Sequence, residues 1–216
     1  IQDEFSKMIT SKHPDLAIKL IFETGAYKYV FGDLRFGYSE VEYLSKSITK
    51  AFERLKNIED AEQDNLEINL AIVYSFLSCA NDRMKFLKYS NDIINKVSFY
   101  LDIFEEINFL QDGNAALRAL QYKAKTFENL FNSWVVYMAV MNMQSSERVI
   151  SDSKEMIEKG QDMFGYKLPI DGEDVMRVLN IGPSEKVKRY LNLVMGVAYL
   201  NPFISKSECE EILKCN

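Results

Sequence analysis

The sequence has few of the residues from which most catalytic and metal sites are built. Histidine occurs once, as His13. This excludes histidine-rich zinc sites, and any Ser-His-Asp triad would have to use His13 itself. His13 precedes a proline at a predicted helix start, where an exposed position is the simpler interpretation. The sequence has no GxxxxGKS, GxxxxGKT or GxGxxG loop. We find no residue pattern that predicts catalysis or a metal site.

Cysteine, proline and glycine are also scarce. The three cysteines (Cys79, Cys209 and Cys215) are an odd number and lack CxxC spacing. They favour a reducing, cytoplasmic location over a disulfide framework. Cys79 lies in an apolar run and is expected to be a buried thiol. Four prolines and nine glycines favour long helices over a turn-rich sandwich.

Long apolar runs and a targeting segment are missing as well. The run 134–141 is far shorter than the roughly 20 residues that span a bilayer, so we expect no membrane partner. The N-terminus lacks a secretory signal and an initiator methionine, which predicts that Ile1 lies inside a longer protein. The net charge of −6 means that an anionic partner must meet a local basic patch.

Apolar residues recur with a helical period along most of the chain. They predict two helices on either side of 13–15, an amphipathic helix over 41–56 and a central, almost wholly apolar helix within 66–80. We find no run that alternates like a strand. The chain is therefore predicted to be all-α, an irregular multi-helix array with a small C-terminal helical subdomain. We place a helical body at 1–150 and a tail subdomain at 151–216.

An aromatic segment separates the second predicted helix from the third. Its rings are dense enough to suggest a base-stacking platform: Tyr27, Tyr29, Phe31, Phe36 and Tyr38. A connecting loop held to the core by its own rings explains them as well, because aromatic side chains mainly supply buried area. We favour the packed loop.

Basic side chains form three local clusters on this acidic chain. The clusters are Arg83, Lys85 and Lys88; Arg118, Lys123 and Lys125; and Lys186, Lys188 and Arg189. The third follows Gly182-Pro183-Ser184, where a helix start would leave backbone N–H groups free to bind an anion. Capping by Ser184 and Glu185 explains part of the same pattern. Phosphate contact and plain capping both remain open.

The segment 168–191, LPIDGEDVMRVLNIGPSEKVKRYL, resembles the tail of bacterial-type CCA-adding tRNA nucleotidyltransferases and poly(A) polymerases. The residues that fit are Gly172, Asp174, Val175, Met176, Pro183, Ser184, Val187 and Leu191. Lys188 stands where that family often has glycine. Residues 1–31 are similar to the family's body segment through Ile1, Glu4, Phe5, Pro14, Ala17, Leu20, Glu23, Thr24 and Gly25. The stretch 83–97 is similar to a further body segment.

The resemblance implies the RNA-docking half of a nucleotidyltransferase that does not transfer nucleotides alone. The Asp-x-Asp head and the Glu-Asp-x-x-Arg neck motif of the family are not in this chain. No cofactor is expected here, and Mg with CTP or ATP is implied for the missing head. The implied partner is tRNA or other RNA, which makes residues 1–150 a helical RNA-binding body. The candidate contacts are Arg118, Lys123, Lys125, Ser184, Lys186, Lys188 and Arg189.

A different class of function is also compatible with the sequence. A helical protein-interaction or dimerisation module would carry the same basic clusters as solvated faces, and the acidic net charge favours it. A homo-oligomer is possible under either hypothesis. Charge reversal at Lys186, Lys188 and Arg189 would separate the two.

Overall fold

The computed structural model describes residues 1–32, 38–108, 113–141 and 147–215. These residues form thirteen α-helices and no strand, which confirms the all-α prediction. The helices are α1 (Gln2–Ile9), α2 (Pro14–Glu23), α3 (Tyr27–Phe31), α4 (Tyr38–Leu55), α5 (Leu66–Tyr74), α6 (Ala80–Phe86), α7 (Asn91–Asn108), α8 (Asn114–Ala124), α9 (Phe127–Met141), α10 (Glu147–Glu158), α11 (Gly172–Leu179), α12 (Glu185–Leu200) and α13 (Lys206–Lys214).

The helices divide into two compact units. The first contains residues 1–109 and 128–150, and the second contains 110–127 and 151–216. The second unit therefore includes α8, which precedes α9 in the chain, together with most of α10 and all of α11 to α13. The functional division into an RNA-binding body (1–150) and a tail (151–216) stays a prediction.

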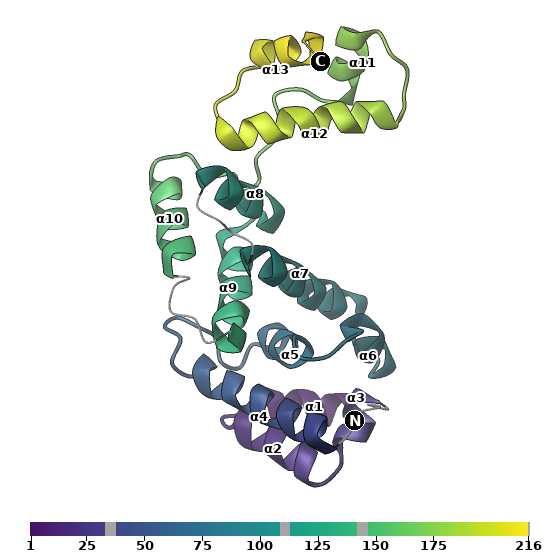
Figure 1. Cartoon of the computed structure of the whole chain (residues 1–216), viewed down its shortest axis with the longest axis vertical. Helices are drawn as coiled ribbons and strands as arrows, with labels where there is room; N and C mark the ends of the chain where they lie inside the picture. Colours follow the sequence, from purple (N-terminus) through teal and green to yellow (C-terminus); the bar gives the residue numbers. More distant parts are fainter. Residues whose placement is uncertain (33–37, 109–112, 142–146, 216) are drawn as a thin grey trace. The chain divides into compact units, whose positions relative to one another are not determined.

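The first unit is built around α5, as the sequence predicted. Every residue from 68 to 74 is buried, because α5 is apolar on all sides and is packed against α1, α4 and α7 (Figure 1). The buried Asn69 amide donates to the carbonyl oxygens of Ile9 and Gln63, each at 2.9 Å. Ile9 is the last residue of α1, so Asn69 caps a carbonyl group that the helix itself leaves free.

The break between α1 and α2 follows the local signals. Pro14 occupies the first position of α2 and His13 is its exposed N-cap residue, as the sequence predicted. Gly25 follows α2 at φ 73°, a left-handed conformation that suits glycine.

Two local predictions were wrong. Residues 27–31 form the short helix α3 instead of a loop, and Phe36 lies outside the described residues. Cys79 is exposed and left-handed (φ 58°) at the N-cap of α6, so it is not the buried thiol we expected. The helix that was expected to include Cys79 ends at Tyr74.

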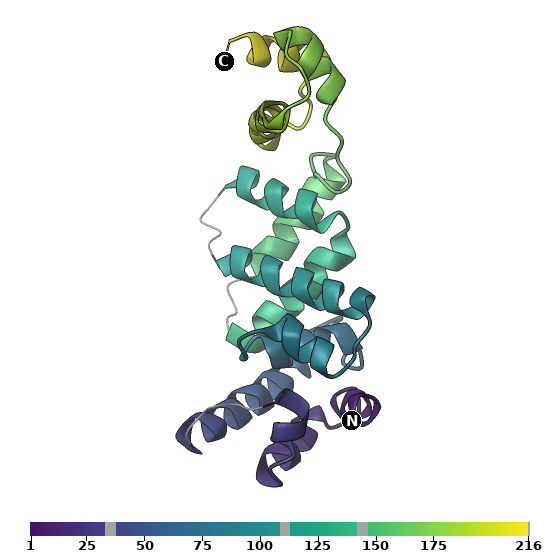
Figure 2. The same ribbon diagram turned by 90° about the vertical axis from the view of Figure 1, so that its right-hand side faces the viewer.

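The end of α3 is tied to α6 by Arg83. Its Nη1 donates to the Phe31 carbonyl oxygen, and its Nε donates to the Ser78 carbonyl oxygen at 2.8 Å. The two helices accordingly lie beside each other in both ribbon views (Figures 1 and 2). A single arginine thus joins segments that are far apart in the sequence.

The second unit has its own apolar core, formed by the inner faces of α11, α12 and α13. Its fully buried members include Val175, Val194 and Cys209. Tyr122 of α8 is packed against this core, and its ring lies 6.1 Å from that of Tyr199. Capping boxes start α11 at Asp171 and α13 at Ser205, which fixes both helix starts.

Candidate nucleic-acid interface

The basic segment of the second unit begins at a sharply defined helix start. The C-cap residue of α11 is Asn180, which is left-handed (φ 51°), and the Ile181 N–H donates back to the Met176 carbonyl oxygen at 3.1 Å. Ser184 then takes the N-cap position of α12 with an extended backbone. Val187 is buried one turn later, so the inward side of α12 is set from its first turn.

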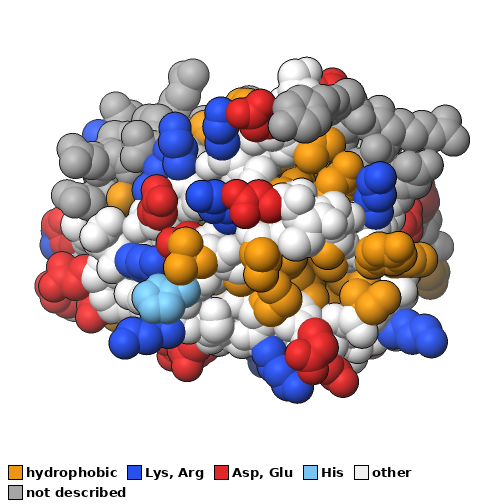
Figure 3. All heavy atoms as spheres, turned by 90° about the horizontal axis from the view of Figure 1, so that it is seen from below, with side chains coloured by type: hydrophobic (Ala, Val, Ile, Leu, Met, Phe, Trp, Pro, Cys, Tyr) orange, Lys and Arg blue, Asp and Glu red, His pale blue; other side chains and the backbone are white. Residues whose placement is uncertain are grey.

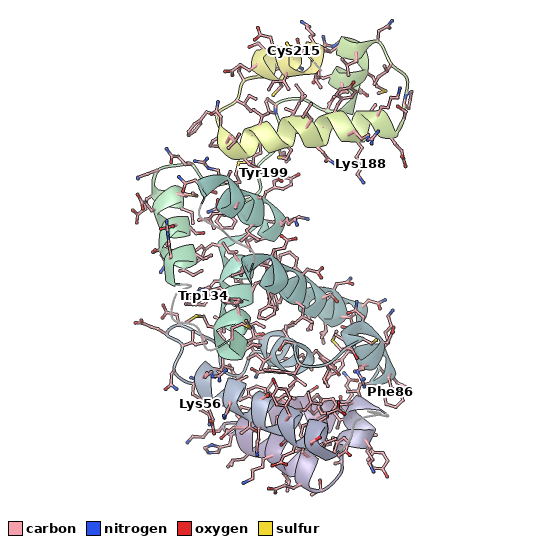
Figure 4. The ribbon with its side chains drawn as sticks, in the orientation of Figure 1. Lys56, Phe86, Trp134, Lys188, Tyr199 and Cys215 are labelled. Atoms are coloured by element: carbon pink, nitrogen blue, oxygen red, sulfur yellow. The ribbon has the colours of Figure 1, made fainter. Side chains whose placement is uncertain are left out.

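The three cations of this segment face solvent. Lys186, Lys188 and Arg189 are exposed, whereas Val187 between them is buried. Within the described ranges, none of the three forms an ion pair with an acidic side chain. Lys188 and Tyr199 project from the same side of α12 (Figure 4). The positive charges of Lys186, Lys188 and Arg189 are therefore available to an anionic ligand.

Side-chain capping by Ser184 explains less of the residue pattern at the start of α12 than the sequence suggested. Ser184 occupies the N-cap position, but its side chain accepts no hydrogen bond from the first turn of α12. The Val187 N–H instead bonds the Ser184 carbonyl oxygen at 3.0 Å. Glu185 does lie in the first turn, where its negative charge suits the helix dipole.

All seven candidate contact residues fall in the second unit. The structure thus assigns to one compact unit two clusters that are separated by a long stretch of sequence. Lys123 and Lys125 are exposed at the C-terminal end of α8, where Lys125 is left-handed (φ 63°). α8 meets α12 through the Tyr122 and Tyr199 rings.

Arg118 differs from the other six because it is buried. Its side chain is 7% exposed. Nη1 donates to the carbonyl oxygens of Tyr199 and Leu200 at 3.1 and 3.2 Å, and Nε donates to that of Gln161 at 3.0 Å. Tyr199 and Leu200 end α12, so the guanidinium caps the negative end of the helix dipole. We therefore assign Arg118 a structural role and leave it out of the proposed contacts.

Asp174, one of the residues that carry the family resemblance, joins α11 to α13. It accepts from Lys206 Nζ at 2.8 Å and from Arg177 Nη2 at 2.7 Å, and Arg177 also pairs with Glu210 at 2.8 Å. These two cationic donors lower the pKa of the Asp174 carboxyl group from 3.8 to about 2. This network fixes α11, the helix that precedes the basic N-terminal end of α12, to α13.

The Asp174 network should make the second unit sensitive to acid. Because the folded pKa is depressed, the stabilisation is fully present above about pH 4 and is lost as pH falls towards 2. Asp174→Asn should be less stable than the wild type at pH 5, and the difference should shrink as pH falls through about 2. Urea unfolding followed by circular dichroism between these values measures it. Parallel stability curves for the two proteins would contradict the assignment.

The lower face of the first unit is chemically different from α12. Hydrophobic side chains gather there among charges of both signs, with His13 at one side (Figure 3). Leu16 and Leu20 of α2 are among the exposed large apolar residues. A face of mixed charge is a weaker anion-binding surface than a group of unpaired cations.

The described residues contain neither a cluster of metal-ligating side chains nor a helix suited to a bilayer. No three or more His, Cys, Asp and Glu side chains lie close enough together to hold a metal ion. No helix in the described ranges combines the length and the apolar character that a bilayer span requires.

Comparison with known proteins identifies a family model that matches the first part of the chain. Residues 1–36 match the family model described as "Probable RNA and SrmB- binding site of polymerase A". The match includes α1, α2 and α3, which belong to the first unit. Searches of curated proteins and of solved structures found no match. The first 36 residues are thus similar to an RNA-binding region of the poly(A) polymerase type.

Proposed function

We propose that this chain binds structured RNA, such as tRNA, and positions its 3′ end for nucleotide addition by a CCA-adding enzyme or poly(A) polymerase. The match of residues 1–36 to an RNA-binding region carries the RNA part of the proposal. The tail pattern of residues 168–191 supports the nucleotidyltransferase part, and the choice between tRNA and another RNA rests on that resemblance.

The second unit contributes contacts with the RNA backbone. Lys186, Lys188 and Arg189 are exposed and have no acidic partner in the region described, and Lys123 and Lys125 add exposed charge in the same unit. Proteins read duplex RNA mainly through phosphate and 2′-hydroxyl groups, so a small set of exposed cations is sufficient. The acidic remainder of the surface confines binding to such patches.

The triple variant Lys186→Glu, Lys188→Glu, Arg189→Glu tests this proposal. We expect its affinity for tRNA to fall about 100-fold at low salt, because three phosphate contacts become repulsive. The slope of log K against log salt should become shallower by about three. Filter binding or fluorescence anisotropy across a salt series measures both quantities.

A matched control separates contact from net charge. Lys154, Lys159 and Lys214 are exposed lysines of the same unit, and their reversal to glutamate changes the net charge by the same amount. This control should retain most of its tRNA affinity, and circular dichroism should show both variants folded. Equal losses in the two variants would contradict a localised contact at α12.

Docking of a protein partner is a second candidate. The description of the matching family model includes SrmB as well as RNA, and α2, inside the matched range, exposes Leu16 and Leu20. Exposed leucines on one helix suit an apolar protein surface better than a phosphate backbone. If docking were the whole function, the α12 triple variant would bind tRNA as the wild type does.

A further inference from the structure

Two helices of the first unit, α3 and α6, are held together by a single arginine and each exposes an aromatic ring. We call these two helices the α3–α6 edge. Phe86, at the end of α6, is 64% exposed, and Tyr29, in α3, is 68% exposed. Arg83 joins the two helices through the Phe31 carbonyl oxygen. Figure 4 shows Phe86 on the outward side of α6. Large rings with this exposure contribute little to the core, so folding alone does not explain them.

The charged side chains on α3, on α6 and just after α6 are mostly basic. Lys28, Lys85 and Lys88 are exposed, and none pairs with an acidic side chain in the part of the chain described. Asp82, in the first turn of α6, is the acidic residue of that helix. Arg83 is occupied by its two carbonyl partners. Together with Lys88, α3 and α6 therefore carry a net positive charge on a chain whose net charge is −6.

We propose that this α3–α6 edge binds an unpaired RNA segment, with Phe86 and Tyr29 stacking on bases and Lys28, Lys85 and Lys88 contacting phosphates. The inference rests on the proposed RNA-binding function and extends it to a second kind of RNA element. α3 lies within the range that matches an RNA-binding region, whereas α6 lies outside it.

Aromatic rings among lysines suit single strands better than duplexes. Unpaired bases offer their flat faces for stacking, and the backbone between them supplies one negative charge per nucleotide. A duplex hides those faces and would leave the two rings unused. A protein partner would use the rings without needing three lysines beside them, so the charge favours RNA.

The Phe86→Ala variant tests the stacking. The probe is a short single-stranded oligoadenylate that contains 2-aminopurine, whose fluorescence falls when the base stacks. The wild type should quench the probe on binding. The variant should lose this quenching and bind about tenfold more weakly. Phe86→Trp should restore both, because a larger ring still stacks.

Phe203 provides a matched control. Its side chain is 66% exposed, close to the value for Phe86, and it lies in the second unit after α12. Phe203→Ala should leave quenching and affinity unchanged. Lys85→Ala combined with Lys88→Ala should keep quenching at saturation but make the salt slope shallower by about 1.4. Wild-type quenching and affinity in Phe86→Ala would overturn the proposal and leave the edge to a protein partner.

The outcomes separate this inference from the proposed function. If the α12 triple variant loses tRNA affinity while Phe86→Ala binds oligoadenylate as the wild type does, the inference alone fails. If the wild-type chain binds neither tRNA nor oligoadenylate, both fail. If Phe86→Ala loses quenching but retains tRNA affinity, the inference stands and the two surfaces act on different parts of the RNA.

Discussion

Arg118→Ala is expected to destabilise the second unit by about 3–5 kcal/mol, because a buried cation leaves carbonyl groups without donors. The guanidinium serves Gln161, Tyr199 and Leu200, and its side chain is only 7% exposed. Alanine removes the donors, removes the positive charge at the C-terminal end of α12 and leaves a gap beside it. No single exposed side chain of that unit should have a comparable effect on folding.

The two units can be followed separately in this experiment. The chain has a single tryptophan, Trp134, which lies in the first unit. Urea unfolding of Arg118→Ala should show an early loss of circular dichroism from the second unit, with little change in the Trp134 fluorescence transition. Arg189→Ala, an exposed arginine of the same unit, should change stability by less than about 0.5 kcal/mol. If Arg118→Ala were as stable as Arg189→Ala, the capping role would be wrong.

The Asn69→Ala variant should lose about 2–3 kcal/mol of stability in the first unit. The Asn69 amide is fully buried and donates to the carbonyl oxygens of Ile9 and Gln63. Alanine leaves both oxygens without this donor, and the bond to the Ile9 oxygen is buried away from water. The lost hydrogen bond to Ile9 lies at the end of α1, inside the range that matches an RNA-binding region.

Trp134 fluorescence is the appropriate measurement for Asn69→Ala, since both residues lie in the first unit. Asn57→Ala is the matched control, because Asn57 is exposed and its amide bonds the Glu53 carbonyl oxygen in its own helix segment. The control should shift the urea midpoint only slightly. Equal midpoints for the two variants would show that the Asn69 bonds add nothing to stability.

The features that could be predicted from the sequence depend on neighbouring residues. Pro14 at a helix start and the uninterrupted apolar residues of α5 act over one or two turns, and both are found as expected. The exposure of Lys186 and Arg189 follows in the same way from the apolar positions around them.

The missed features depend on residues far away in the chain. Arg118 looked like a surface cation because its acceptors lie 43, 81 and 82 residues further on. Residues 27–31 looked like a loop, and α3 is linked at Phe31 to an arginine 52 residues away. No local sequence pattern indicates hydrogen bonds between residues so far apart in the chain. An arginine among apolar residues near a helix middle, as in α8, is the one signal that could have pointed to a buried role.

The discontinuity of the second unit has a consequence for the order in which the protein can fold during synthesis. α8 is made before α9, but its partners in α12 are made only after α9, α10 and α11. Domains generally fold as units, beginning with the N-terminal one. The first unit has all of its residues once 150 has been made. The carbonyl groups of Tyr199 and Leu200, to which Arg118 donates, are made later. The surface that carries the α12 cations is therefore completed only after residue 200 has been made.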